Sequence, residues 1–269
     1  MDRSRLKTTI ILILALLNLC LLFSLLSRSN AQRESREQAA QQLSALFQAD
    51  GIRLSPEAIP HQVPPPGQSL SRDRELEERL ISVFLGEHFS ITDQGGGIFT
   101  YGSHAGAARC GSNGSFDILG TVIQSDAEAF FRRFCREYHY KKLSASLDES
   151  GSGTLEAVRF FEGLPVFNCT VTFTVESDAI TKVRGTLLPE HASDLPQEFE
   201  ALSALAALTT FLDLRRESGA FVSEISAVDL AYELQDSSSS SLTLTPAWCI
   251  RTDTNSYYVN CYTGSVTPG

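Results

Sequence analysis

Cysteine and histidine are the side chains of this chain best suited to chemistry, because a thiolate beside an imidazole can act as a nucleophile. Cys135 and His139 lie four residues apart on one predicted helix. Cys135, however, adjoins Phe134 on the apolar side of that helix, where a buried and unreactive thiol is the favoured interpretation. His139 ends the helix, where a cation interacts favourably with the helix dipole. We therefore expect both residues to be structural.

The sequence lacks the motifs of common catalytic and cofactor sites. It contains no G-x-S-x-G, H-E-x-x-H, P-loop or dinucleotide fingerprint, and no Cys/His cluster with zinc-like spacing. No helix follows Gln94-Gly-Gly-Gly97, so a hairpin turn is favoured there over a phosphate site. Acidic residues are scattered rather than paired, which argues against a wall hydrolase with two carboxylates. We expect no enzyme activity, no metal and no cofactor.

The cysteines leave two arrangements open. Cys20 lies in the apolar N-terminal run and the other five, Cys110, Cys135, Cys169, Cys249 and Cys261, lie beyond it. Cys249 and Cys261 fall on two predicted strands of one hairpin, so they are the candidates for a disulfide. The alternative is that all the thiols are reduced, because an oxidising compartment permits disulfides without requiring them.

Twenty uncharged residues, 8–27, separate Lys7 from Arg28. At about 1.5 Å per helical residue they match a bilayer core of about 30 Å, which predicts a single transmembrane helix. Residues 1–7 carry three basic residues and one acid, which predicts a cytoplasmic leader and an extracytoplasmic remainder. A signal peptide cleaved after Ala31 is the alternative, although the apolar run is longer than is usual for one.

Asn18, at the middle of this run, needs a hydrogen-bond partner in the membrane. It therefore forms, with Ala15 and Leu22, the candidate surface for binding a partner helix. The alternative is that Asn18 bonds its own helix backbone and has no further role.

Beyond Arg28 the chain has 18 Lys and Arg against 31 Asp and Glu, a net charge of −13. Nucleic acids and anionic lipids both attract basic surfaces, so neither is an expected ligand of this region.

Periodicity predicts the remaining organisation. Residues 28–70 are predicted to form a helical stalk, with Leu43, Leu46 and Phe47 as its apolar stripe, followed by a Pro-rich linker. Residues 71–269 are predicted to form the folded domain, built from units of about 71–122, 124–189 and 198–269. Each unit places an amphipathic helix before antiparallel strands. The fold class is therefore α+β, with helices covering a sheet, and not a doubly wound parallel sheet.

The clearest elements are a helix and a hairpin. Ser125-Asp-Ala-Glu128 predicts a capping box, and five apolar residues follow at helical spacing: Ala127, Phe130, Phe131, Phe134 and Tyr138. The third unit is predicted to begin with a helix over 198–216. Near the C-terminus, Trp248 and Ile250 are expected to face Val259 and Tyr257 across a hairpin.

Three segments resemble the YycI (WalI) family of Gram-positive bacteria. They are the N-terminus Met1-Asp2-Arg3-Ser4, the run Phe161-Glu-Gly-Leu-Pro-Val-Phe167, and the ending Pro246-Ala-Trp248 through Tyr262-Thr-Gly264-x-Val266, which is also similar to PepSY-type domains. The resemblance implies a membrane-anchored, non-catalytic regulator of the WalK/WalR two-component system. It also implies two partners, a sensor histidine kinase and a YycH-like protein, and a role in cell-wall homeostasis. A PepSY-like module that binds a peptide or inhibits a protease is the alternative.

Overall fold

The computed structural model describes residues 14, 17–19, 22, 34–123, 126–196, 200–236 and 241–269. Most of the predicted span over 8–27 lies outside these residues, and the five of it that are described are helical and exposed. Among the described residues, no helix has the length and apolar character needed to cross a bilayer. The transmembrane helix therefore stays a prediction.

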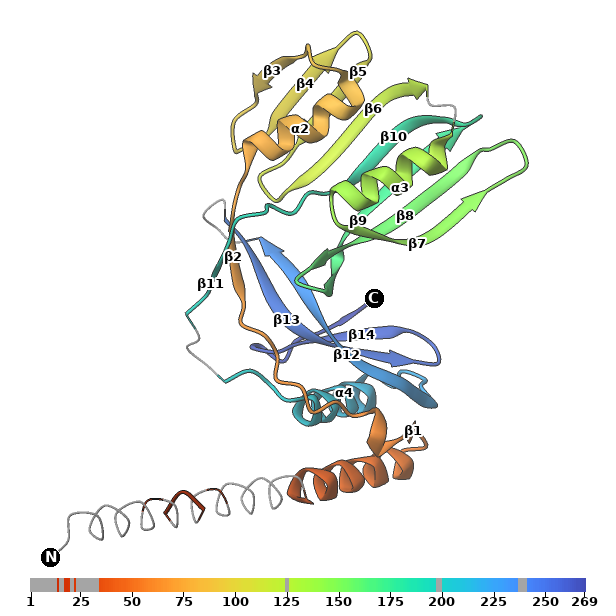
Figure 1. The fold of residues 1–269 in the computed structure, drawn as a ribbon. Helices are drawn as coiled ribbons and strands as arrows, with labels where there is room; N and C mark the ends of the chain where they lie inside the picture. The colour runs from red at the N-terminus through yellow and green to blue at the C-terminus, as the bar shows by residue number, and fades with distance from the viewer. Residues whose placement is uncertain are drawn as a thin grey trace, which may run out of the picture.

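The described chain forms an upper and a lower body, each made of helices on one face of an antiparallel sheet (Figure 1). A helix over 34–49 comes first. The elements of the upper body are α2 (Arg74–Leu85), β3 (Ser90–Asp93), β4 (Phe99–Ser103), β5 (Gly106–Cys110), β6 (Ser115–Ile123), α3 (Ala127–Glu137), β7 (Tyr140–Leu147), β8 (Gly153–Phe161), β9 (Leu164–Glu176) and β10 (Ala179–Thr186). Those of the lower body are β1 (Arg53–Leu54), η1 (Pro56–Ala58), β2 (Gln68–Ser71), β11 (Ala192–Asp194), α4 (Ala204–Ser218), β12 (Glu224–Asp236), β13 (Ser241–Thr252), β14 (Ser256–Asn260) and β15 (Val266–Pro268).

One pattern occurs three times along the chain, a helix followed by four strands. The three copies are α2 with β3–β6, α3 with β7–β10 and α4 with β12–β15. This confirms the predicted α+β class. The first two copies share one sheet, in the order β7-β8-β9-β10-β6-β5-β4-β3, because β6 pairs with β10. They also share one core, since α2 and α3 pack side chains such as Phe84, Phe130 and Phe134 around Phe173 of β9.

Two predicted helix starts are wrong. Asp126, rather than Ser125, is the N-cap of α3, and its carboxylate accepts a hydrogen bond from Ala129 N at 2.7 Å. α4 begins at Ala204, after the N-cap Ser203, and not at residue 198. The buried face of α4, which includes Ala204, Ala207 and Phe211, packs against the lower sheet. The side chains of Asp126 and Ser203 each accept a hydrogen bond from a backbone N–H group in the first turn of their helix. These bonds fix where each helix can start.

The described part of the predicted stalk, residues 34–49, is helical as predicted but packs against the lower body instead of standing apart from it. Phe47 is fully buried and its ring stacks on Phe211 of α4, with centroids 6.5 Å apart. Ala40 and Leu43 are buried beside it, whereas Leu46, which the sequence placed on the apolar stripe, is 52% exposed. The residues that follow pair as β1 with β12, and Arg216 of α4 bonds Asp50 at 2.6 Å. The helix over 34–49 is therefore part of the lower body.

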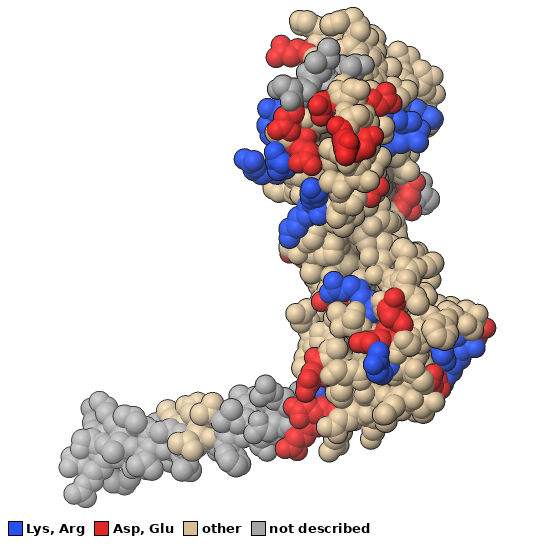
Figure 2. Space-filling view, turned by 90° about the vertical axis from the view of Figure 1, so that its right-hand side faces the viewer, with Lys and Arg blue, Asp and Glu red and all other residues tan. Residues whose placement is uncertain are grey.

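The two bodies join where β9 meets β12. These strands pair in parallel at Val166 and Tyr232, and the Asn168 amide extends the pairing. Its Nδ2 donates to Leu234 O at 2.7 Å, and its Oδ1 accepts from Leu234 N at 2.8 Å. A small apolar core surrounds the joint, made by Leu70, Val166, Cys169, Leu188, Tyr232, Leu242 and Leu244. Figure 2 shows that Lys, Arg, Asp and Glu gather on the two bodies and are sparse on the narrow region between them.

The predicted disulfide between Cys249 and Cys261 is not formed, and both thiols are free. Trp248 and Ile250 pair with Val259 and Tyr257, as predicted, and face α4. Successive side chains of a strand alternate between faces, so Cys249 points away from α4 while Cys261 belongs to the core beneath it. The sheet therefore separates the two sulfur atoms.

We expect both thiols to be alkylated when the full chain is unfolded without reductant, because they start on opposite faces of the sheet. Burial raises the pKa of Cys261 to about 12, so its alkylation in the native protein at pH 8 should be very slow. Peptide mass spectrometry after labelling measures both outcomes. A peptide linking Cys249 to Cys261 in the unreduced sample would contradict the structure.

Candidate functional site

The upper sheet has one face that neither α2 nor α3 covers. The helix-covered face carries the buried side chains of the core, such as Tyr101, Cys110, Phe116 and Val183. The residues between them on each strand point to the opposite face. Strand register aligns one of these from every strand in a polar row: Thr92, Thr100, Arg109, Asp117, Arg184, Thr172, Glu156 and Ser144.

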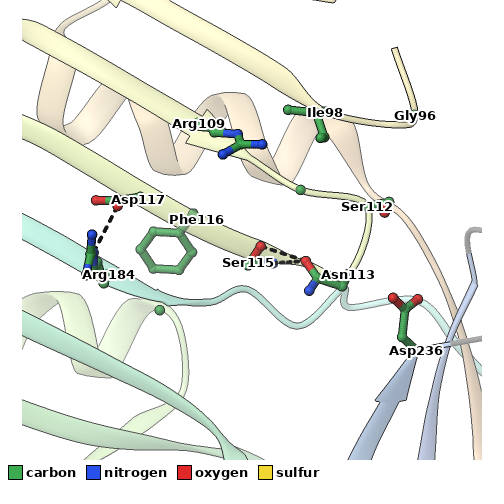
Figure 3. A pocket seen from close by; sticks show the side chains of 12 residues that line it. Gly96, Ile98, Arg109, Ser112, Asn113, Ser115, Phe116, Asp117, Arg184 and Asp236 are labelled. Carbon is green, nitrogen blue, oxygen red and sulfur yellow. Dashed lines mark hydrogen bonds and ion pairs between the residues drawn. The ribbon is translucent and has the colours of Figure 1, made fainter. Parts of the chain in front are cut away.

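A groove of about 620 Å³ lies at the centre of this row (Figure 3). Arg109 of β5 and Arg184 of β10 flank Asp117 of β6, and Arg184 Nε bonds Asp117 Oδ2 at 2.9 Å. The other oxygen of Asp117 is buried and has no hydrogen-bond partner in the part of the chain that the structure describes. Asp236, from the end of β12, borders the groove from the lower body. The site is therefore shared between the two bodies.

The β5–β6 turn forms one wall of the groove. Asn113 Oδ1 accepts hydrogen bonds from Ser115 N at 3.1 Å and from Ser115 Oγ at 2.6 Å, which closes the turn. Gly114 has φ of +76°, and a Cβ there would lie 2.6 Å from Leu187 O. Only glycine fits this position, because a side chain would combine an unfavourable φ with a backbone clash.

A buried ion pair fixes the β3–β4 turn, which forms another wall. The Arg72 guanidinium makes two bonds to the Glu77 carboxylate, of 2.6 and 2.8 Å, and both side chains are largely buried. The same guanidinium donates to Gly97 O, while Arg74 lies over the Phe99 ring at 3.8 Å. The hydrogen bonds that Arg72 donates to the Glu77 carboxylate raise the pKa of the guanidinium. The turn is therefore tied to the first turn of α2.

The groove carries charged groups suited to binding. Two guanidinium groups and two carboxylates can recognise a polar or charged segment through charge-assisted hydrogen bonds. None of the described residues that line it is a histidine or a cysteine. Across the described residues, no group of three or more His, Cys, Asp or Glu side chains is placed to hold a metal ion.

The structure places Cys135 and His139 in different environments. Cys135 is buried in the upper core, and burial raises the pKa of its thiol to about 11. His139 lies beyond the end of α3, in the left-handed region with φ of +55°, and is exposed. The thiol is a weak nucleophile there, in agreement with its predicted structural role.

Two of the three predicted partner-binding residues, Asn18 and Leu22, lie in the described part of the N-terminal segment. Ala15 is outside the described residues. Asn18 and Leu22 are described and exposed, and Asn18 Nδ2 donates to Leu14 O at 3.0 Å. The Asn18 amide thus bonds its own helix, which is the alternative stated from the sequence. Their role in binding a partner stays a prediction.

Sequence reasoning missed the groove. The sequence does contain the relevant residues, because Arg109, Asp117 and Arg184 occupy polar positions within predicted strands. Bringing them together requires the pairing of β6 with β10, which joins residues 67 positions apart.

Comparison with known proteins places the chain in no family. No protein-family model matches it, and no curated protein matches it. Among solved structures 11 chains match. They include an uncharacterized protein from Eubacterium rectale, with 11% identity and a TM-score of 0.43 over 77% of this chain and 81% of that one.

Two further solved structures carry names. The C-terminal domain of YpeB from Bacillus megaterium matches 74% of this chain and 98% of its own, with 11% identity and a TM-score of 0.37. YycH from Bacillus subtilis matches 77% of this chain and 53% of its own, also with 11% identity and a TM-score of 0.37. The resemblance to YycI itself stays a prediction.

Replacing Glu77 by Gln should lower the free energy of unfolding by about 3 kcal/mol, because it leaves the largely buried Arg72 guanidinium without a carboxylate. Glu78→Gln on the same helix is the matched control, since its pair with Arg74 is exposed on both sides, and its cost should stay below about 0.5 kcal/mol. Urea denaturation of the two variants measures both values. Equal costs would show that the Arg72–Glu77 pair does not hold this wall of the groove.

Proposed function

We propose that this chain is a non-catalytic membrane protein with one N-terminal span, residues 8–27, a cytoplasmic N-terminus and an extracytoplasmic body. The body binds a partner and biases a sensor histidine kinase of a two-component system that controls cell-wall homeostasis. A YycH-like protein is the second partner. The three sequence segments that resemble YycI support this choice of pathway.

One structural observation carries the proposal, the integration of the helix over 34–49 into the lower body. This helix is separated from the proposed span by only a few residues. Phe47, stacked on Phe211, and the Asp50–Arg216 ion pair fasten it to α4. A flexible tether would dissipate any movement of the body. A helix packed at this position can pass a rotation or tilt of the body towards the membrane.

The uncovered face of the upper sheet supplies a binding surface. It lies in the body farther from the helix over 34–49 (Figure 1). Arg109 and Arg184 offer charge-assisted donors, while Asp236 ties the groove to the lower body. A partner that bridges the groove would therefore contact both bodies at once. Recognition at this place can therefore shift both bodies together, and with them the helix over 34–49.

The groove also favours a second candidate function, a PepSY-like module that binds a peptide without any kinase. In that case the polar row is the ligand site itself, and the N-terminal segment only localises the protein. The two functions differ in one testable respect: replacing the span by a foreign one should abolish kinase regulation but leave peptide binding intact.

Phe47→Ala should uncouple the helix over 34–49 from α4 and lower the free energy of unfolding by about 3 kcal/mol, since it removes a fully buried ring. Leu46→Ala, one residue earlier and 52% exposed, is the matched control and should change stability by less than about 0.5 kcal/mol. If kinase output in cells is compared at equal protein levels, Phe47→Ala should abolish regulation and Leu46→Ala should retain it. Unaltered regulation by Phe47→Ala would refute transmission through this helix.

Purification of the full chain from membranes of a Gram-positive host should recover the sensor kinase and a YycH-like protein. A chain with a foreign span and a chain without residues 1–27 are the controls, and both should lose the kinase. Arg109→Ala with Arg184→Ala should weaken recovery of the partner bound at the groove. Recovery of neither protein by the full chain would reject the kinase function and favour the peptide-binding module.

A further inference from the structure

A second cavity, of about 430 Å³, lies beside the β8–β9 hairpin, away from the groove. Its lining comes from the end of α3, from β8, from the hairpin turn and from the segment after β10: His139, Arg159, Phe160, Phe161, Glu162, Gly163, Pro189 and Glu190. Arg159 pairs with Tyr140 of β7 in the strand register and is only 6% exposed. The cavity thus has a buried cation in its wall.

Arg159 has no anionic partner among the described residues. Its Nη1 atom is fully buried without a hydrogen-bond acceptor, and none of the salt bridges of the described chain involves it. The neighbouring polar groups are committed elsewhere, since Tyr140 Oη donates to Thr186 O at 2.5 Å and Cys169 Sγ donates to the same oxygen at 3.0 Å. Burial lowers the pKa of Arg159, although the guanidinium stays charged. The guanidinium carbon lies 5.9 Å from the centre of the Tyr140 ring, a contact that does not neutralise the charge. A buried charge without an anionic partner is costly, and an anion in the cavity would reduce that cost.

The rest of the cavity restricts which anion fits. The half-buried rings of Phe160 and Phe161 and the buried Pro189 offer apolar walls. Glu162 and Glu190 are exposed at the rim, where they repel multiply charged anions such as phosphate. A single negative charge on an apolar body suits this combination best.

We propose that this cavity binds the carboxylate of a ligand with an apolar body, such as the free C-terminus of a peptide that ends in a hydrophobic residue, with Arg159 as the counterion. The site is separate from the groove, so it does not depend on the proposed kinase regulation.

Calorimetry on the full chain in lipid nanodiscs tests this with two probes, N-acetyl-Ala-Ala-Phe with a free carboxylate and the same peptide with a C-terminal amide. The acid should bind and the amide should not. Arg159→Gln should weaken binding of the acid by about tenfold or more, because the carboxylate loses its charged partner. Arg136→Gln, an exposed arginine of α3, is the matched control and should leave binding unchanged.

Glu190→Gln separates this proposal from an internal pairing, in which the Glu190 carboxylate itself closes onto Arg159. We expect Glu190→Gln to strengthen binding of the acid and to leave the melting temperature unchanged. A fall in melting temperature together with no binding of the acid would assign the counterion to Glu190 and overturn the proposal.

The stability of the Arg159 variants completes the test. Removing an unpaired buried charge should leave the melting temperature of Arg159→Gln equal or higher, and Arg159→Lys, which keeps the charge, should retain part of the affinity. Equal binding of acid and amide, unchanged binding by Arg159→Gln, or displacement of the acid by an equal concentration of inorganic phosphate would each overturn the carboxylate site.

Discussion

The arrangement of this molecule depends on how β9 and β12 meet. Both are long strands of 13 residues. One edge of β9 pairs with β8 from Leu164 to Val175. Its other edge pairs with β12 of the lower body at Val166 and with β10 from Val171 onward. Parallel pairing between the bodies is limited to Val166 and Tyr232, so the strand edges would soon leave polar backbone groups without partners. The Asn168 amide supplies both a donor and an acceptor to Leu234 and thus replaces a peptide group. The Asn168 side chain therefore makes the two hydrogen bonds that a backbone peptide group makes elsewhere in the sheet.

Three features follow from this joint. It sets Asp236, at the end of β12, near the β5–β6 turn of the upper body, so the groove spans both bodies (Figure 3). It leaves the polar face of the upper sheet uncovered, since the helices of that body occupy the opposite face. It also connects this face, through β12 and α4, to the helix over 34–49. The stacked rings of Phe167 and Tyr258, 3.7 Å apart, add a second contact between the bodies.

The sequence predicts the local elements well where one face is clearly apolar. The stripe of Phe130, Phe131 and Phe134 gave α3, and alternation gave the closing hairpin with its pairs Trp248–Val259 and Ile250–Tyr257. The failures have physical causes. Leu46 is as apolar as Phe47, and only the position of α4 decides which of them is buried. The merging of two units into one sheet, and with it the groove, depends on strand pairs distant in sequence, which no local pattern encodes. The lack of an anionic partner for the buried Arg159 is likewise visible only in three dimensions.

The central claim is that the two bodies and the helix over 34–49 form one rigid unit. Electron paramagnetic resonance measures this directly, with one spin label at Leu46→Cys on the helix over 34–49 and another at Arg136→Cys on α3, in a Cys20→Ser chain held in nanodiscs. The other five thiols are buried and should stay unlabelled. The account predicts a single narrow distribution of distances between the labels. A broad distribution with several maxima would show that the bodies reorient freely, and would contradict the account.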